Sequence, residues 1–434
     1  MTVYTDGSCE DNGKLTARAG SGIYIKPDHP NNRAIRVPGP LQSNQVGELV
    51  AVIAALQDIP PFVPITIATD SMYVIDGLTK HLGHWEDIGW LGVANSQFFQ
   101  AAAYQLRRRS ARTSFQWVKG HDNNPGNEAA DALAKQGSEK DAADQIDLTV
   151  PTNFTIQGAK LSCLTQAIAY RGVRARRALT VTPRQGAVIN LDRTRYGLEE
   201  VTHSLETDQQ IWLSWHNKNL RAEVRQFTHK ALHRTQKVGD YWTPIDGYQY
   251  RAICPFCKDT TESMEHIWLE CDTPERALIW KLAKQLWPRA HGEWSNLPFG
   301  AILGSGKLTL PPAATHMPGS ESDGGEIKQQ RAGASRLLQI LVSESAYLIW
   351  TLRCQRVIQG NTHSLAAINT RWTNAINRRL TTDRVTAAKL TRKPKFEQTV
   401  ANTWKGTLRG EQQLPKDWMM NDEVLVGIRT VQAS

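Results

Sequence analysis

The chain has 434 residues, of which 40% are hydrophobic and 21% are charged, close to the composition of an ordinary soluble globular protein. At about 100–200 residues per domain, this length implies two or three domains. The longest unbroken apolar run, Leu49–Leu56, is far shorter than the ~20 residues that span a bilayer, and the start MTVYTDGSC lacks a signal-peptide pattern. We therefore expect an intracellular protein, nuclear or cytoplasmic, and exclude the secreted and membrane classes.

The net charge of +9 is unevenly distributed. Residues 1–140 carry 13 Lys and Arg against 14 Asp and Glu, whereas residues 141–434 carry 38 against 28. Two segments are densest: 171–195 has seven arginines and one acid, and 371–395 has eight Lys and Arg and one acid. Such density suits a phosphate backbone, so the basic C-terminal region is predicted to bind nucleic acid. The alternative is that the charge serves solubility alone.

The first 140 residues alternate strand and helix patterns. Val3–Thr5 predicts a short strand that ends at Asp6, because Gly7 and Ser8 break it. Further strands are predicted at Gly20–Ile25, Ala34–Val37, Ile65–Thr69 and Phe115–Val118, and helices at Asn44–Leu56 and Asn127–Lys135. This alternation predicts an α/β domain.

Four acids occupy special places in this pattern. Asp6 and Asp70 are predicted at the C-terminal ends of strands, and Glu48 and Asp131 lie on helices. Side chains at strand ends converge outside an α/β sheet, where ligands bind. Carboxylates gathered at one spot repel each other unless a cation neutralises them, and oxygen ligands of this kind select Mg²⁺ or Mn²⁺. The pattern favours a divalent-metal site, although coincidence among the many acids is the open alternative.

Five segments of residues 1–140 carry these acids or lie between them. They are YTDGSC (4–9), RAGSGIYIKPDHP (18–30), NQVGELVAVIAAL (44–56), TDSMYVIDGL (69–78) and WVKGHDNNPGNEAADALA (117–134). In content and order they resemble type 1 ribonuclease H, most closely its cellular eukaryotic branch. The resemblance implies a ribonuclease H-like fold, which is a five-stranded mixed sheet with flanking helices. It also implies an endonuclease that hydrolyses the RNA strand of RNA–DNA hybrids.

The resemblance also assigns site residues. Asp6, Glu48, Asp70 and Asp131 match the family's catalytic, metal-binding carboxylates, and His121 matches its mobile catalytic histidine. The implied reaction is in-line displacement at phosphorus with two Mg²⁺ (or Mn²⁺) ions, in which His121 moves a proton or helps to release product. The positions that contact the RNA 2′-OH or a phosphate of the DNA strand are matched by Ser8, Cys9, Asn12, Ser43, Asn44, Gln45 and Asn95.

The substrate-handling loop departs from the family pattern. It is shorter, and Glu86 and Asp87 sit where basic residues usually hold the duplex. Phosphate contacts supply most of the non-specific affinity for a duplex. Residues 1–140 alone are therefore expected to bind hybrids weakly. The basic C-terminal region is expected to supply the missing affinity.

A cysteine and histidine motif lies in the second half of the chain. Cys254 and Cys257 have two residues between them, His266 follows after eight residues, and Cys271 follows after four. This spacing predicts a tetrahedral Cys₃His site for one structural Zn²⁺. Buried cysteines beside a helical histidine would explain each residue singly but not the spacing.

The segments around this motif, HKALHRTQKVGDYWTPI (229–245) and MEHIWLEC (264–271), resemble the zinc-binding tail that follows reverse transcriptase in non-LTR retrotransposons. The resemblance implies derivation from such an element and suggests a separate reverse transcriptase as a partner.

The rest of the chain is predicted from its composition. The acidic stretch Ser138–Asn153 predicts the domain boundary. Apolar residues at helical spacing predict one helix over Leu338–Leu352, ended by Gly360, and another over Leu365–Leu380. The predicted organisation is a ribonuclease H domain (1–140), a basic linker or helical region (141–200), a zinc-binding helical region (201–300), a flexible loop rich in Gly, Pro and Ser (304–333) and a helical basic region (334–434).

Three functions are compatible with these patterns. The leading hypothesis is an Mg²⁺-dependent ribonuclease H whose zinc-bearing, basic second part anchors nucleic acid. The alternative is a non-catalytic, nucleic-acid-binding transposon relic, but random decay would strike some of the four carboxylates or His121, and all are present. A third is a DNA-cutting, integrase-like nuclease of the same superfold, against which Asn44 and Gln45 favour the RNA-cutting branch.

Overall fold

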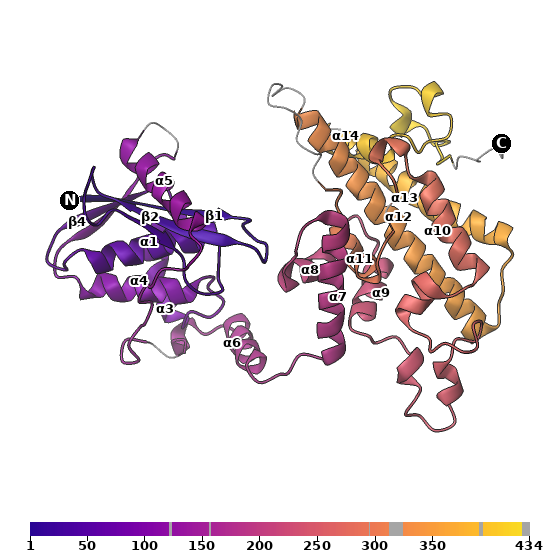
Figure 1. Cartoon of the computed structure of the whole chain (residues 1–434), viewed down its shortest axis with the longest axis horizontal. Helices are drawn as coiled ribbons and strands as arrows, with labels where there is room; N and C mark the ends of the chain where they lie inside the picture. The colour runs from indigo at the N-terminus through magenta and orange to yellow at the C-terminus, as the bar shows by residue number, and fades with distance from the viewer. Residues whose placement is uncertain (121–123, 156–157, 295, 312–323, 390–393, 428–434) are drawn as a thin grey trace. The chain divides into compact units, whose positions relative to one another are not determined.

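The structure, a computed structural model, describes residues 1–120, 124–155, 158–294, 296–311, 324–389 and 394–427. The chain forms two compact units, residues 1–182 (unit 1) and 183–434 (unit 2), which are both visible in Figure 1. Within the described ranges, no helix combines the length and the apolar character that a membrane span requires.

Unit 1 is built on a mixed sheet of five strands in the order β3-β2-β1-β4-β5. The strands are β1 (Thr2–Glu10), β2 (Arg18–Tyr24), β3 (Arg33–Arg36), β4 (Ile65–Thr69) and β5 (Thr113–Trp117). β1 is antiparallel to β2 and parallel to β4, and β4 is parallel to β5. The predicted five-stranded mixed sheet is confirmed.

Helices cover both faces of this sheet. They are α1 (Asn44–Asp58), α2 (Met72–Asp76), α3 (Leu82–Asp87), α4 (Ser96–Arg108) and α5 (Pro125–Glu139). In Figure 1, α1 and α4 lie on one face and α5 lies on the other. α1 is buried on all sides from Val46 to Leu56, which anchors it between the sheet and α4. The Ser43 hydroxyl caps its first turn by accepting a hydrogen bond from the Val46 N–H at 3.2 Å.

β1 is longer than the sequence predicts. Its pairing with the parallel strand β4 ends at Tyr4, opposite Ala68, but its pairing with β2 continues to Glu10. The prediction that Asp6 ends the strand is therefore wrong. Asp6 lies where β1 has left β4 and is still paired with β2. The hydrogen bonds that β2 provides keep Gly7 extended, and local propensity cannot show such a partner.

Unit 1 extends beyond the predicted boundary at Ser138–Asn153. Three apolar side chains that alternate with polar residues in this acidic stretch pack against the core of unit 1: Ile146, Leu148 and Val150. The backbone N–H of Arg36 donates to the Asp144 carboxylate at 2.6 Å. This stretch therefore belongs to compact unit 1, because every second side chain of Ile146–Val150 packs on its core although the stretch is acidic.

The predicted linker region 141–200 is divided between the units. α6 (Gln166–Ala178) belongs to unit 1, and α7 (Gln185–Thr202) belongs to unit 2, where Leu191 and Leu198 join the core. The units divide between Thr182 and Pro183.

Unit 2 is mainly helical, as predicted. Besides α7 it contains α8 (Asp208–Ser214), α9 (Ala222–Leu232), α10 (Pro274–Leu286), α11 (Phe299–Leu303), α12 (Gly324–Gln359), α13 (Leu365–Lys389) and α14 (Pro394–Trp404). Its core holds the fully buried side chains of Trp268, Trp372 and Trp404. Gly360 follows α12 with φ of 68°, so the predicted end of that helix is confirmed.

The predicted flexible loop 304–333 is wrong for residues 324–333, which are helical. α12 begins at Gly324, because the segment 326–332 supplies good helix formers after the paired glycines. Residues 305–307 form a 3₁₀ turn, and residues 312–323 lie outside the described part of the chain.

Part of the basic segment 371–395 lies inside unit 2. Arg379 is buried and donates to the Asn219 carbonyl at 2.8 Å, and Arg384, only 2% exposed, pairs with Asp422 at 3.1 Å. A buried charge is tolerated only when it is paired or hydrogen-bonded. These two arginines therefore stabilise the fold of unit 2, and the nucleic-acid contact predicted from the density of this segment does not apply to them.

Candidate functional site

Three of the four predicted carboxylates meet at one edge of the sheet. The carboxylate oxygens of Asp6, Glu48 and Asp70 lie within 4.8 Å of one another. The register explains this for two of them: Tyr4 is the last residue of β1 paired with β4, opposite Ala68, and Asp6 and Asp70 each follow two residues later. Glu48 is brought in by α1, which packs on β1.

The carboxylate site is buried and strongly repulsive. Asp6 and Glu48 are 7% and 8% exposed, and the Glu48 Oε2 atom is buried with no hydrogen-bond partner among the described residues. Burial, followed by the charge of Asp70, raises the pKa of Asp6 to about 7. Burial and the charge of Asp6 raise the pKa of Glu48 well above its usual value. An uncompensated cluster of hard oxygen ligands fits a divalent cation such as Mg²⁺.

Asp131 completes this site from α5. It lies close enough to Asp6 for its charge to raise the Asp6 pKa. On the opposite side, the loop after β5 closes on Asp70: a Cβ atom on Gly120 would lie 2.4 Å from the Asp70 Oδ2 atom. His121 follows Gly120 directly and lies outside the described residues.

The predicted substrate-binding residues fall into two groups. Ser8 and Cys9 lie in the last part of β1, and Asn12 is exposed in the turn after it. Ser43, Asn44 and Gln45 form the start of α1, where Asn44 and Gln45 are exposed. Ser43 already serves as the helix cap through its hydroxyl oxygen.

The structure brings Asn95 to the second group. The Asn95 side-chain amide donates to the Gln45 side-chain Oε1 atom at 3.5 Å and to the Tyr73 hydroxyl at 3.1 Å. Sequence reasoning does not single out Tyr73. Its signal in the sequence is its place in the first turn of α2, three residues after Asp70.

The four zinc-ligand candidates also converge, in unit 2. Cys254 and Cys271 sulfurs are 3.8 Å apart, Cys257 and Cys271 sulfurs are 3.7 Å apart, and the Cys257 sulfur is 3.4 Å from His266 Nε2. Around a tetrahedral Zn²⁺ with Zn–S of about 2.3 Å, neighbouring sulfurs are about 3.8 Å apart. The donor set and its spacing therefore fit one tetrahedral zinc ion.

The surrounding structure orients these side chains. The Ser263 hydroxyl accepts from the His266 backbone N–H at 2.9 Å, and the other ring nitrogen of His266 faces Glu270 at 3.6 Å. Between the two ligand pairs, Glu262 is buried and accepts a hydrogen bond from the Arg353 guanidinium at 2.9 Å. This buried ion pair fixes the ligand-bearing loop to α12.

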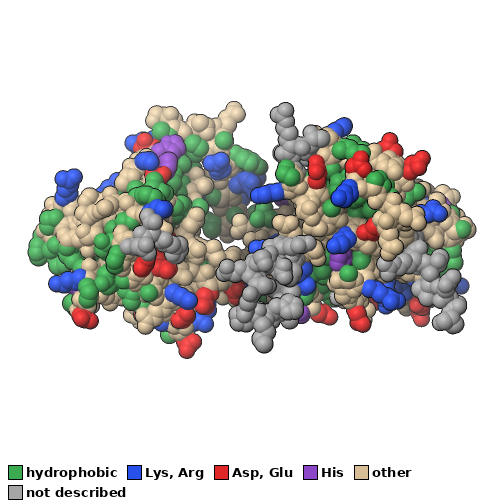
Figure 2. Space-filling model, turned by 90° about the horizontal axis from the view of Figure 1, so that it is seen from above, with side chains coloured by type: hydrophobic (Ala, Val, Ile, Leu, Met, Phe, Trp, Pro, Cys, Tyr) green, Lys and Arg blue, Asp and Glu red, His purple; other side chains and the backbone are tan. Residues whose placement is uncertain are grey.

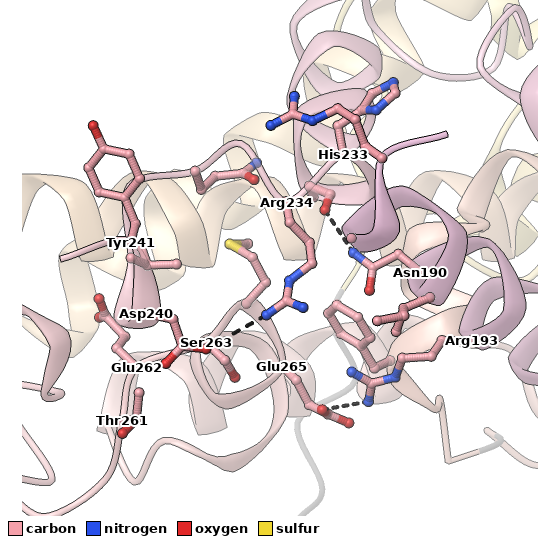
Figure 3. Close-up of a pocket in the computed structure, with 18 residues that line it drawn as sticks. Asn190, Arg193, His233, Arg234, Asp240, Tyr241, Thr261, Glu262, Ser263 and Glu265 are labelled. Atoms are coloured by element: carbon pink, nitrogen blue, oxygen red, sulfur yellow. Dashed lines mark hydrogen bonds and ion pairs between the residues drawn. The ribbon is translucent and has the colours of Figure 1, made fainter. Parts of the chain in front are cut away.

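A cavity of about 660 Å³ adjoins the same loop. Figure 3 shows Arg193 and Arg234 projecting into it from α7 and from the segment after α9. Arg193 is paired with Glu265 at 2.5 Å and Arg234 with Asp240 at 3.9 Å. These two arginines therefore already have acidic partners within unit 2.

Comparisons with known proteins concern the first 139 residues of the chain. The model of the RNase H family matches residues 1–139. Human ribonuclease H1 is 37% identical over 145 residues, covering 32% of this chain and 50% of that protein. Ribonuclease HI of Pseudomonas aeruginosa is 35% identical over 151 residues, covering 32% of this chain and 92% of that protein. A solved structure, LC9-RNase H1, is 27% identical with a TM-score of 0.27, covering 32% of this chain and 71% of that one.

The aligned region spans about half the length of the mammalian ribonucleases H1 and nearly all of the bacterial enzymes. The family match falls entirely within unit 1 and includes Asp6, Glu48, Asp70 and Asp131. Through residues 1–139, the chain therefore belongs to the ribonuclease H family.

Proposed function

We propose that this protein is an endonuclease that hydrolyses the RNA strand of RNA–DNA hybrids with the help of two bound Mg²⁺ or Mn²⁺ ions. The observation that carries the proposal is the cluster of Asp6, Glu48 and Asp70, whose carboxylate oxygens lie within 4.8 Å of one another, with Asp131 close to Asp6. Family membership supports the choice of substrate, because the relatives that match are named as ribonucleases H.

Asp6 on β1 and Asp70 directly after β4 lie close together and would both hold the ions, with Glu48 and Asp131 completing the ligand set. When bound, such ions stabilise the attacking and leaving oxygens of a phosphoryl transfer. The raised pKa of Asp6 means that its carboxyl must lose a proton for the ions to bind, so their affinity should fall at acidic pH. His121, next to Gly120 in the chain, is proposed to move a proton near the leaving group.

The exposed start of α1 is proposed to choose RNA. Asn44 and Gln45 offer donors and acceptors beside Glu48, where a ribose 2′-OH of the bound strand would lie. Gln45 is linked to Asn95, which we propose holds a phosphate of the DNA strand. This pairing would couple recognition of one strand to the position of the other.

The test is cleavage of a labelled RNA–DNA hybrid by the full chain with Mg²⁺, set beside RNA–RNA and DNA–DNA duplexes of the same sequence. Cleavage confined to the RNA strand of the hybrid is the expected result. Hybrid binding without cleavage at any Mg²⁺ or Mn²⁺ concentration would instead support the non-catalytic relic, and DNA cleavage would support the integrase-like alternative.

For unit 2 we propose one structural Zn²⁺ held by Cys254, Cys257, His266 and Cys271. The sulfur spacing of 3.7–3.8 Å supports this site. We also propose, from the sequence resemblance, that the chain derives from a non-LTR retrotransposon and works with a separate reverse transcriptase. Elemental analysis of protein purified without chelator should find one zinc per chain, and its absence would refute the zinc site.

A further inference from the structure

The helix α6 (Gln166–Ala178) carries an unusual concentration of cations. Arg171, Arg174, Arg176 and Arg177 are all exposed on it. The sequence contains no Asp or Glu between Asp147 and Asp192, so these arginines have no acids near them along the chain. Figure 2 shows Lys and Arg side chains gathered over this part of the molecule.

These four arginines differ from Arg193 and Arg195 of the same basic segment. In unit 2, Arg193 is paired with Glu265, and Arg195 is paired with Asp192 and Asp208. Among the described residues, no α6 arginine forms an ion pair or a side-chain hydrogen bond. The Arg174 guanidinium lies over the Tyr170 ring, 6.0 Å from its centroid, which leaves its N–H groups available. Their charge is therefore free to meet an anionic partner.

α6 lies against the catalytic part of unit 1. A Cβ atom on Gly172 would lie 3.3 Å from Leu91, and a Cβ atom on Gly92 would lie 3.2 Å from the Arg171 side chain. Leu91 and Gly92 belong to the connection from α3 to α4, which leads within three residues to Asn95. The arginine-bearing helix thus adjoins the loop that ends at the proposed DNA-strand phosphate contact.

The acids of this loop are neutralised within the unit. Glu86 accepts a hydrogen bond from Arg107 at 2.8 Å. Asp87 pairs with Lys160 at 2.5 Å, and its carbonyl accepts from the Lys160 backbone N–H at 2.8 Å. Lys160 comes from the same segment as α6, so this segment both removes the local negative charge and adds four positive charges.

We propose that Arg171, Arg174 and Arg177 of α6 bind backbone phosphates of the RNA–DNA hybrid and hold it on unit 1. Residues three apart share one face of a helix, so these three arginines form one cationic row, whereas Gly172 faces Leu91. The inference rests on the proposed function and adds to it a substrate-binding element outside residues 1–139. The partner is a nucleic-acid duplex because a row of unpaired arginines complements regularly spaced phosphates.

The experiment compares two variants of the full chain. Arg174→Gln/Arg177→Gln removes two charges from the row, and glutamine preserves helix propensity. The control, Lys26→Gln/Arg112→Gln, removes two exposed charges of unit 1 next to the ends of β2 and β5 that lie away from Asp70. Binding of a hybrid is measured without divalent ions across about 50–200 mM salt, and cleavage is measured separately with Mg²⁺.

The α6 variant should bind the hybrid at least fivefold more weakly at about 150 mM salt. Its slope of log affinity against log salt should fall by about 1.8, because each phosphate that is no longer neutralised reduces the slope by ~0.9. KM should rise while kcat stays unchanged, because no proposed metal ligand is altered. Affinity and slope equal to those of the control would overturn the inference. The α6 arginines would then be assigned to an acidic protein partner instead. Failure of the wild-type chain to cleave hybrids would refute the proposed function instead, and the binding comparison would still be decisive for α6.

Discussion

A Cβ atom on Gly7 would lie 2.2 Å from the backbone nitrogen of Glu48. α1 therefore packs directly on the backbone of β1, one residue beyond Asp6. This close approach brings the Glu48 carboxylate, which comes from a helix, to the two carboxylates that come from strands.

Gly7→Ala should therefore damage both the fold and the site. The atoms that the added methyl group would meet belong to the backbone of α1 and cannot rotate away, so we expect a loss of about 1–3 kcal/mol in unfolding free energy. Hybrid cleavage should also fall, because α1 must move away from Asp6. Gly83→Ala is the control, since a Cβ there meets nothing within 4 Å. Wild-type stability and activity of Gly7→Ala would show that α1 can shift without cost.

Asp70→Asn should abolish hybrid cleavage and leave the fold intact. The substitution keeps the shape of the side chain and removes a charge that the proposed ions share. A loss of at least a thousandfold in kcat/KM, about 4 kcal/mol, is expected. Circular dichroism checks the fold, and activity within tenfold of wild type would contradict the role given to Asp70.

The metal-free protein should become less stable as pH rises. The folded protein retains a proton on Asp6 up to about pH 7, whereas the unfolded chain releases it near the ordinary value of 3.8, so the unfolding free energy falls between these limits. Glu48→Gln should reduce this fall, because it removes one repelling charge. The test is scanning calorimetry in EDTA at pH 5 and pH 8. The transition to follow is the one whose unfolding temperature rises when Mg²⁺ is added.

Glu10→Gln serves as the control for that measurement, since Glu10 is exposed at the end of β1. Equal stability at the two pH values for the wild-type chain would show that the carboxylates are not strained without metal.

Cys271→Ser should release zinc and loosen unit 2, because metal binding contributes folding free energy at such sites. Hybrid cleavage should persist at saturating substrate, since no proposed catalytic residue lies in unit 2. The matched control is Cys163→Ser, which changes a cysteine that is not part of the cluster. Zinc content and the unfolding of both variants are the readouts. Retention of a full zinc equivalent by Cys271→Ser would mean that the ligand set is wrong.

A fragment ending at Asn153 should bind hybrids more weakly than the full chain and with a shallower salt slope. It lacks α6 and all of unit 2, and residues 1–140 carry a net charge of −1. A fragment of residues 1–182 should recover a large part of the affinity, because it restores the α6 arginines while Arg379 and Arg384 of unit 2 are internal. Equal hybrid binding by both fragments would show that the α6 arginines do not contribute to the affinity.

The catalytic part of this protein could be predicted from local sequence patterns. Asp6, Glu48, Asp70 and Asp131 sit in motifs whose residues also form the elements that carry them, such as the buried strand Ile65–Thr69 before Asp70. The ligand spacing of Cys254 and Cys257 is equally local. Such ligand candidates can be predicted from sequence because they are neighbours, along the chain, of the residues that form the strand or helix carrying them.

Which charges are available to a partner depends instead on packing between distant segments. Arg384 and Arg177 both lie in segments of the sequence that are dense in Lys and Arg. In the structure, however, Arg384 is buried and paired with Asp422, whereas Arg177 is exposed on α6. The same holds for Asp6, whose place within β1 depends on pairing with β2, and for the acidic stretch that packs on unit 1. These outcomes depend on partners 15 to 100 or more residues away, and a local pattern contains no information about such partners.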